Sequence, residues 1–232
     1  EKGLILRLFR HLTELNQITH PLSMATGIFD GVHLGHQAVI REAVRRARQM
    51  RGKAVLLTFH PHPAKILRPD STPLLLTTEQ QDYELFSALD ADACVILDFN
   101  EELSRCPAAD FLNHMIQSAP SLRAVVVGPQ WHFGHDRRGD FRLLQSWAAT
   151  QGIEAIEAQP VLFEGEVISS TTIRRLIMAG DITGASPRMI EQLAREVAAA
   201  KGVVNISTYN WGKFYHGDLI ERAMLLIFAL CG

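Results

Sequence analysis

The sequence predicts an α/β protein with a doubly wound parallel sheet and a small, mostly helical C-terminal extension. Short β-rich apolar runs alternate with segments whose apolar residues recur at helical spacing. Several of these runs are apolar throughout, which is typical of strands buried on both faces of a parallel sheet. The chain has 232 residues, of which 47% are hydrophobic, enough for one sizeable core with a small appendage.

The elements follow one another in a regular order. The expected strands are residues 4–9, 24–29, 54–59, 94–99, 124–127 and 154–161. An apolar stripe that starts near Val39 predicts a long helix after the second strand, and we expect Gly52 to end it. Further helices are expected after a cap at Thr77 or Thr78, after Pro107, over residues 140–151, and after a cap at Ser169 or Ser170.

The alternation of strands and helices stops after Gly184. We therefore expect one domain over residues 1–184 and an extension over residues 185–232. The extension is apolar in places, but its longest apolar run is too short to cross a bilayer. It is open whether these residues form a helical cap, an interface or a remnant of another module.

Composition narrows the classes of partner. The net charge is −2 and the pI is near 6.6, so no general basic surface for nucleic acid or membrane is expected. Three cysteines without metal-type spacing fit a reduced, cytoplasmic setting. The oligomeric state is left open.

The segment from Thr26 to Gln37 is typical of a phosphate site. Glycines at 27, 31 and 35 allow tight turns and close backbone approach to a ligand. The start of the following helix presents free N–H groups and the positive end of the helix dipole. His33 and His36 add donors that can follow charge on a transferring phosphoryl group.

Two further segments bring histidines to strand ends. His60-Pro61-His62-Pro63 ends one strand, and His132 and His135 lie in the loop after another. This clustering fits either a phosphate site or a metal site, with carboxylates from Asp30, Asp136 or Asp140 completing the metal site.

A last segment, Ile168 to Arg174, places hydroxyl groups at a helix start. Backbone N–H groups and hydroxyls there make a second anion site. Arg174 lies in the first turn of that helix, where its guanidinium can hold a phosphate through two parallel hydrogen bonds.

These segments together resemble the bacterial FAD synthetase family of the nucleotidyltransferase superfamily. His33-Leu34-Gly35-His36 matches the superfamily signature His-x-Gly-His, and the string from Gly27 to Gln37 resembles the FAD synthetase branch. The family's Thr-Phe-x-Pro-His-Pro and Ile-Ser-Ser-Thr-x-Ile-Arg motifs are matched at residues 58–63 and 168–174. In the segment Val127 to Gly134, Gln130 replaces the usual Asp or Asn, and Trp131 replaces Phe.

The resemblance implies a Rossmann-like fold and an FMN adenylyltransferase, in which FMN and ATP give FAD and pyrophosphate. Magnesium is expected to arrive with ATP. The expected catalytic residues are His33, His36, Ser170, Thr171 and Arg174. The expected ATP-binding residues are Gly27, Phe29, Asp30, Gly35 and Ser169. The expected flavin-binding residues are Phe59, His60, Pro61, His62, Gln130 and Phe133.

The sequence does not match the riboflavin kinase part that most family members carry. No Gly-x-Pro-Thr-Ala-Asn segment is found, so we expect no riboflavin phosphorylation by this chain. Three alternatives stay open beside FMN adenylylation. They are an adenylyl- or cytidylyltransferase with another phosphate acceptor, a metal-dependent hydrolase, and a flavin or nucleotide sensor without catalytic activity.

Overall fold

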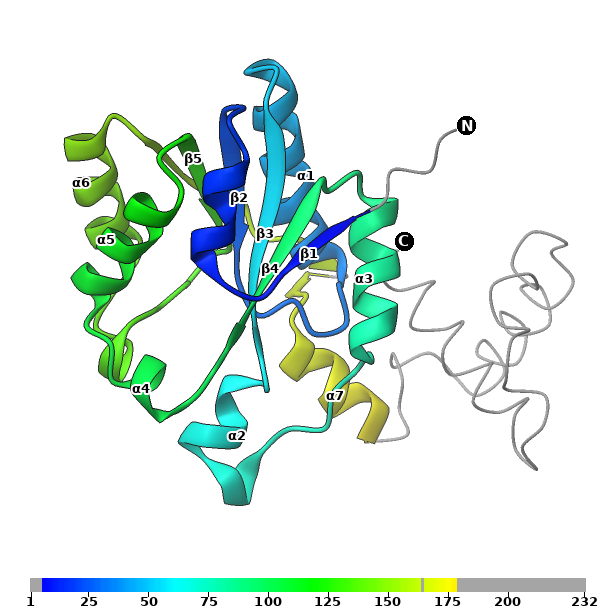
Figure 1. Cartoon of the computed structure of the whole chain (residues 1–232). Helices are drawn as coiled ribbons and strands as arrows, with labels where there is room; N and C mark the ends of the chain where they lie inside the picture. The colour runs from blue at the N-terminus through cyan, green and yellow to red at the C-terminus, as the bar shows by residue number, and fades with distance from the viewer. Residues whose placement is uncertain (1–5, 164, 179–232) are drawn as a thin grey trace, which may run out of the picture. The chain divides into compact units, whose positions relative to one another are not determined.

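The computed structural model describes residues 6–163 and 165–178 (Figure 1). The chain divides into two compact units, Glu1–Ile168 and Ser169–Gly232, and each is described by itself. The first unit contains the sheet and its helices. The described part of the second unit contains helix α7 (Ser170–Met178). The domain boundary expected at Gly184 and the predicted extension lie outside the described residues.

A six-stranded parallel sheet forms the centre of the first unit. Its order is β1-β4-β3-β2-β5-β6, and every neighbouring pair is parallel. From β2 the chain winds outward through β3 and β4, then crosses back to β5 and β6. This reversal is the doubly wound arrangement, so the predicted fold class is confirmed. The strands are β1 (Arg7–Phe9), β2 (Leu22–Thr26), β3 (Lys53–His60), β4 (Ala93–Asp98), β5 (Leu122–Val127) and β6 (Glu154–Glu157).

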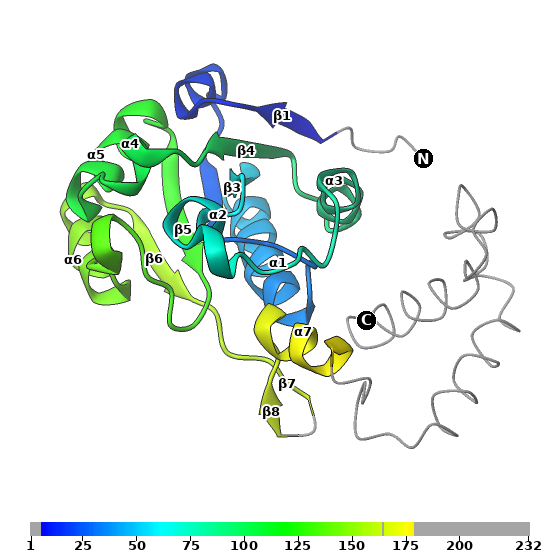
Figure 2. The same ribbon diagram turned by 90° about the horizontal axis from the view of Figure 1, so that it is seen from below.

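Helices cover both faces of the sheet. Figure 2 shows α1 (Leu34–Gln49) and α3 (Glu79–Ala88) on one face, and α5 (Ala108–Ser118) and α6 (Phe141–Gln151) on the other. The short helices α2 (Pro63–Leu67) and α4 (Glu101–Ser104) follow the carboxyl ends of β3 and β4 (Figure 1). Three 3-10 turns, η1 (Leu12–Gln17), η2 (Pro69–Ser71) and η3 (His135–Arg137), and the hairpin of β7 (Leu162–Phe163) and β8 (Glu166–Val167) complete the unit.

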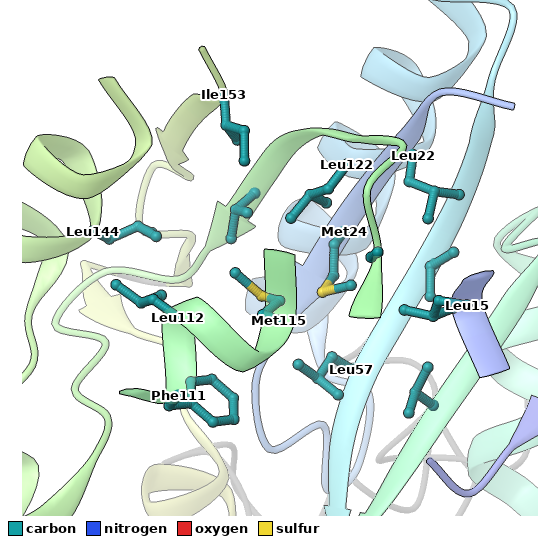
Figure 3. Close-up of a cluster of buried hydrophobic side chains, with 14 of the residues drawn as sticks. Leu15, Leu22, Met24, Leu57, Phe111, Leu112, Met115, Leu122, Leu144 and Ile153 are labelled. Atoms are coloured by element: carbon teal, nitrogen blue, oxygen red, sulfur yellow. The ribbon is translucent and has the colours of Figure 1, made fainter. Parts of the chain in front are cut away.

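The strands supply two cores because successive side chains point to opposite faces. Met24 and Val125 are paired in register and face the core beneath α5 and α6, which Figure 3 shows. Their neighbours Ala25 and Val126 face the core beneath α1 and α3. Burial on both faces explains why these strands are apolar throughout.

Helix α1 ends one residue earlier than the glycine suggests. Arg51 takes the left-handed conformation (φ 53°), its N–H donates to Arg48 O, and the N–H of Gly52 donates to Ala47 O at 2.8 Å. These two bonds form a Schellman motif with Arg51 in the position that glycine usually occupies. The prediction that Gly52 ends the helix is therefore wrong in its mechanism. Gly52 is needed because a Cβ there would lie 2.0 Å from Pro21 O.

Other differences from the predicted elements have local causes. The second strand ends at Thr26, not at residue 29, because the chain turns into a loop after Gly27. The sixth strand ends at Glu157, not at residue 161, and Pro160 cannot donate a strand hydrogen bond. The sequence pattern predicts no helix at α2, yet Pro63 is compatible with the first turn of a helix. Within the described residues, no helix has the length and apolar character needed to span a membrane.

Candidate active site

The candidate site lies at the carboxyl edge of the sheet. β2 lies between β3 and β5, although the chain reaches β5 only after leaving β4. This is the switch point of the sheet, outside which ligands bind in open α/β folds. Three segments that carry motifs lie at this edge, each at or just after the end of a strand. They are residues 27–33, 60–63 and 128–134.

The loop between β2 and α1 has a strained backbone just before the first histidine. Gly31 has φ 85° and Val32 has φ 37°. Positive φ is a genuine outlier for a β-branched residue. The surroundings fix Val32 there, because its side chain is buried and its carbonyl accepts from Gln37 Nε2 at 3.1 Å. The geometry of this loop is thus held by packing around it.

His33 is the N-cap of α1. Its Nδ1 accepts the backbone N–H of His36 at 3.3 Å, and its side chain is 4% exposed. Because Nδ1 is an acceptor, the neutral ring carries its proton on Nε2. The cap therefore fixes the tautomer and makes Nε2 a hydrogen-bond donor.

Gly35 makes room for the His33 ring. A Cβ at Gly35 would lie 3.1 Å from Cε1 and Nδ1 of that imidazole, and 3.4 Å from Ile168 O. The glycine of the His-x-Gly-His signature is thus required by the close approach of the histidine two positions earlier, not by its own φ.

His36 is held between aromatic rings. Its imidazole is stacked on that of His33, with centroids 3.6 Å apart and 23° between the planes. The ring of Phe29 meets His36 edge-on at 5.5 Å and also contacts Phe86 in the core at 5.8 Å. These contacts orient both predicted catalytic histidines of the first unit as one stack.

Asp30 bonds to a distant part of the chain. It is 6% exposed, and its Oδ1 accepts the backbone N–H groups of Leu76 (2.8 Å) and Thr77 (3.4 Å). The family resemblance implies that Asp30 binds ATP. In the structure, Oδ1 of Asp30 connects the loop to the segment before α3.

The loop after β3 separates its two histidines. His62 caps α2, because its Nδ1 accepts the N–H of Ala64 at 3.1 Å. His60 precedes a cis peptide bond to Pro61, and its Nδ1 lies 3.6 Å from Glu79 Oε1. Among the described residues, no group of three His, Cys, Asp or Glu side chains is arranged to hold a metal ion. The metal-site interpretation therefore gains no support from this geometry.

A groove of about 780 Å³ opens at the carboxyl edge of the sheet, and Gly27 and Ile28 of the loop that leads to the histidines line part of it. Pockets of this size hold small molecules and cofactors. Four of the six predicted flavin residues line it, namely Phe59, His62, Gln130 and Phe133, together with Gly27. His60 instead lines a smaller recess of about 60 Å³ with Phe29 and Asp30, and Pro61 lines neither.

Aromatic and basic side chains that the motifs did not mark also line the groove. They are Phe99, Phe111, Arg68, Arg105 and Arg137. Phe99 follows directly on β4, so the rule that ligands bind at carboxyl ends of strands would have found it. Arg105 follows α4, a short helix that the sequence did not predict, and nothing in its spacing marks it.

Phe133 and Trp131 form a stacked pair in this groove. Their centroids are 4.2 Å apart with 17° between the planes, and Phe133 also contacts Phe111 at 6.1 Å. Phe133 is buried in the core cluster and also lines the groove. Its predicted contact with a flavin stays a prediction.

Gln130 has a left-handed backbone with φ 57° and an exposed side chain. Asn and Asp tolerate this conformation better than longer residues, because their short polar side chains can bond locally. The Asp or Asn that the family usually carries is therefore accounted for by the backbone alone.

In the second unit, Ser169 caps α7. Its Oγ accepts the N–H of Thr172 at 3.1 Å and lies 2.9 Å from Thr172 Oγ1. Ser170 begins the helix, Thr171 is exposed, and Arg174 lies one turn later and is half-buried. The predicted cap is thus confirmed at Ser169, and the anion site expected at this helix start stays a prediction.

Burial perturbs acidic groups beside the smaller recess. Burial raises the pKa of Asp82 to about 7, although a hydrogen bond from Thr77 opposes the shift. Burial and the neighbouring Glu79 raise the pKa of Tyr83 to about 12. Asp82 is therefore the carboxyl group in this region that can titrate near neutral pH.

The chain is similar in sequence to known bacterial proteins. The chain is 33% identical over 155 residues to a bifunctional riboflavin kinase/FMN adenylyltransferase of Pseudomonas fluorescens, covering 67% of this chain and 50% of the relative. It is 26% identical over 220 residues to the protein of that name from Buchnera aphidicola subsp. Schizaphis graminum, covering 94% of this chain and 66% of the relative. The chain thus spans between half and about two thirds of these relatives.

A solved structure has the same fold. The crystal structure of a protein named macrolide-efflux protein, from Streptococcus pneumoniae, superposes with a TM-score of 0.66 at 25% identity, covering 78% of this chain and 62% of that one. The sequence profile of FAD synthetase matches residues 15–172, which include every predicted site residue except Arg174. The chain belongs to the FAD synthetase family.

Proposed function

We propose that this protein transfers AMP from ATP to FMN, giving FAD and pyrophosphate. The observation that carries the proposal is the stacked pair of His33 and His36 at the start of α1. The loop that leads to this pair begins with Gly27 and Ile28, which line a groove rich in aromatic side chains. A phosphate site next to a groove for a planar ring is what joining a flavin phosphate to a nucleotide requires. The names of the similar bacterial proteins support the same reaction.

In the proposed reaction, the FMN phosphate attacks the α-phosphorus of ATP in line with the leaving pyrophosphate. One P–O bond forms, the bond to pyrophosphate breaks, and no enzyme nucleophile takes part. The protein then acts by positioning and by charge stabilisation. The Nε2–H of His33 and the ring of His36 would donate to the reacting phosphates. Magnesium would enter as part of the MgATP substrate and would offset the negative charge of its phosphates.

The other predicted residues receive proposed roles. Gly27, Phe29 and Gly35 would line the adenine nucleotide, with Asp30 shaping the loop around it. Ser169, Ser170, Thr171 and Arg174 would hold pyrophosphate as it leaves, because a capped helix start with an arginine one turn later suits an anion. We assign this reaction to residues 1–184 and propose that residues 185–232 form a separate extension.

The acceptor is proposed to be a flavin because of the rings in the groove. Phe59, Phe99 and Trp131 offer faces and edges to a planar ring. Arg68, Arg105 and Arg137 add positive charge for a phosphate-bearing acceptor. An acceptor without an aromatic ring would leave these surfaces unused.

The first test is to mix the protein with FMN and MgATP and to separate the flavins by chromatography. We expect FAD and pyrophosphate in equal amounts. The variant His33→Asn should retain the helix cap, since Asn also caps well, but lack the Nε2 donor. We expect its kcat to fall about 100-fold or more with an unchanged melting temperature.

The matched control is His114→Asn, the same change at an exposed histidine of α5. It should leave kcat unchanged. Absence of FAD from a folded wild-type protein that binds ATP would refute the flavin acceptor. FAD formation at the wild-type rate by His33→Asn would refute the role of His33.

A further inference from the structure

The loop that carries the histidines is joined to the segment before α3 by a set of hydrogen bonds that the reaction itself does not explain. This segment, residues 72–78, runs from η2 to α3 across the carboxyl edge of the sheet (Figure 2). It lies 46 positions from the loop in sequence. Residues 76 and 77 nevertheless contact residues 30 and 31 through both backbone and side chains.

The central contact is a relay through the Thr77 hydroxyl. The N–H of Gly31 donates to Thr77 Oγ1 at 2.8 Å, and Thr77 Oγ1 donates in turn to Asp82 Oδ1 at 2.6 Å. A hydroxyl has one proton. Because that proton goes to Asp82, a lone pair of Thr77 faces Gly31, and each bond strengthens the other.

Asp30 and Gly31 make further contacts with the same segment. Asp30 Oδ1 accepts the N–H groups of Leu76 and Thr77, at 2.8 and 3.4 Å. Gly31 has φ 85°, and a Cβ there would lie 2.7 Å from Leu76 Cδ1. The two segments are therefore fitted to each other closely, with Gly31 at the point of contact.

The position of this connection gives it a consequence for the histidines. Gly31 is followed by Val32, whose positive φ is unfavourable and must be held by its neighbours, and then by His33. A loop released at Gly31 could relax at Val32 and move the His33 ring by some tenths of an ångström. Displacements of this order are costly for reactions that depend on positioning.

We propose that Thr77 and Asp82 are positioning residues for the phosphate chemistry, acting through the relay from Gly31 to hold the loop that presents His33 and His36. Neither residue needs to touch substrate. The reaction in which they act is the adenylyl transfer proposed above, and the tests below separate the two proposals.

Asp82 also makes the relay sensitive to pH. Above its pKa of about 7 the bond from Thr77 is charge-assisted, and below it the bond is between neutral groups and about half as strong. The titratable or charged groups around Asp82 come from several elements. They are Glu79 and Tyr83 on α3, Asp30 after β2, His60 at the end of β3, His62 after β3, Cys94 on β4, and Arg10 near Glu79.

The test compares Thr77→Val, Thr77→Ser and Thr78→Ala. Valine keeps the shape of threonine but has no hydroxyl, whereas serine keeps the hydroxyl. Thr78 is the matched control, because it caps α3 through the N–H of Gln81, whereas the bonds to the loop described above come from Leu76 and Thr77. We expect Thr77→Val to lower kcat about 10-fold or more with a smaller change in the KM for ATP, Thr77→Ser to restore kcat, and Thr78→Ala to lower only the melting temperature.

Hydrogen exchange of the peptide that covers residues 27–33 gives a readout independent of catalysis. Exchange should be faster in Thr77→Val than in Thr77→Ser or Thr78→Ala. If Thr77→Val matches Thr78→Ala in both kcat and exchange, the positioning role is wrong. If the wild-type protein makes no FAD, the proposed function is wrong. The hydrogen-exchange test of the relay still applies in that case: exchange in Thr77→Val equal to that of the wild type would show that the relay does not hold the loop.

Asp82→Asn supplies the third readout. The amide oxygen still accepts from Thr77 but does not titrate. The ratio of wild-type to variant kcat should rise at least about threefold between pH 6 and pH 8. A ratio independent of pH would overturn the part played by Asp82.

Discussion

The imidazole of His33 lies against that of His36 with 3.6 Å between centroids, while its Nδ1 accepts the backbone N–H of the same residue. His36 thus contacts His33 in two ways, through its stacked ring and through the backbone N–H that His33 caps. This double contact sets the direction of the His33 Nε2–H bond, and any change that shifts one ring must shift the other.

Gly35→Ala tests this arrangement directly. The new Cβ would lie 3.1 Å from the His33 ring, so the imidazole must move by a few tenths of an ångström. We expect kcat for FAD formation to fall about 10- to 100-fold while the fold is kept. Gly128→Ala is the control, because its Cβ would make an ordinary contact of 3.6 Å with Val39. Equal kcat in the two variants would contradict the packing role of Gly35.

Gln130→Asn should stabilise the protein. Asparagine tolerates the left-handed conformation at this exposed position better than glutamine, so we expect a gain of about 0.5–1 kcal/mol in the free energy of unfolding. Urea unfolding monitored by circular dichroism measures it. The same change at Gln80, which is exposed within α3, should cost a few tenths of a kcal/mol.

The same Gln130 variant also distinguishes an enzyme from a sensor. We expect kcat to change less than about threefold, because the backbone accounts for the family's preference. A much larger rise in kcat would instead support the sensor alternative, in which the natural site is impaired.

Phe99→Leu should raise the KM for FMN without changing the KM for ATP. Phe99 lines the groove and meets Phe59 edge-on at 5.8 Å, so leucine removes an aromatic face from the proposed flavin site. Loss of one such contact corresponds to about 1 kcal/mol, or roughly fivefold in KM. Phe163→Leu, at an exposed residue of β7, is the control. A rise in the KM for ATP alone would place the nucleotide, not the flavin, in this groove.

Arg51 and Gly52 should respond to substitution with opposite signs. Arg51→Gly relieves a left-handed residue at the end of α1 and should stabilise by about 0.5–1 kcal/mol. Gly52→Ala places a Cβ against Pro21 O and should destabilise by about 1–3 kcal/mol. Thermal unfolding of both variants measures these two changes in stability. Stabilisation by Gly52→Ala would contradict the structure of this turn.

Asp82→Asn should change how stability depends on pH. The folded protein raises the pKa of Asp82 from 3.8 to about 7, so it binds this proton more tightly than the unfolded chain does. The carboxyl group therefore lowers stability progressively as pH rises from about 4 to 7, by at most about 1.4 kcal/mol for each pH unit. We therefore expect the free energy of unfolding of the variant, relative to that of the wild type, to be higher at pH 8 than at pH 4. A constant difference would mean that Asp82 has an ordinary pKa.

Local patterns in the sequence predicted most of the fold. Apolar runs identified the strands of the sheet, and the cap at Thr78 and the stripe on α1 identified two of its helices. Short elements were missed because their signals are ambiguous. Pro63 marks a stiff loop as well as a helix start, and α4 has only four residues.

The candidate site was predictable only where its residues are close in sequence. The relation of Gly35 to His33 lies within one motif. The contact of Thr77 with Gly31 spans 46 positions, and no spacing in a single sequence reveals it. The groove combines the ends of β3, β4 and β5, so only its residues within motifs, such as Phe59 and Phe133, were found.

The order of the strands has a consequence for how such a protein can change over generations. The histidines follow β2, whereas the aromatic groove is built mainly after β3, β4 and β5. The residues proposed to act on ATP and the surface proposed to select its acceptor therefore lie on separate stretches of the gene. Mutations can alter the second while the first stays intact, which makes a new acceptor easier to acquire than a new chemistry.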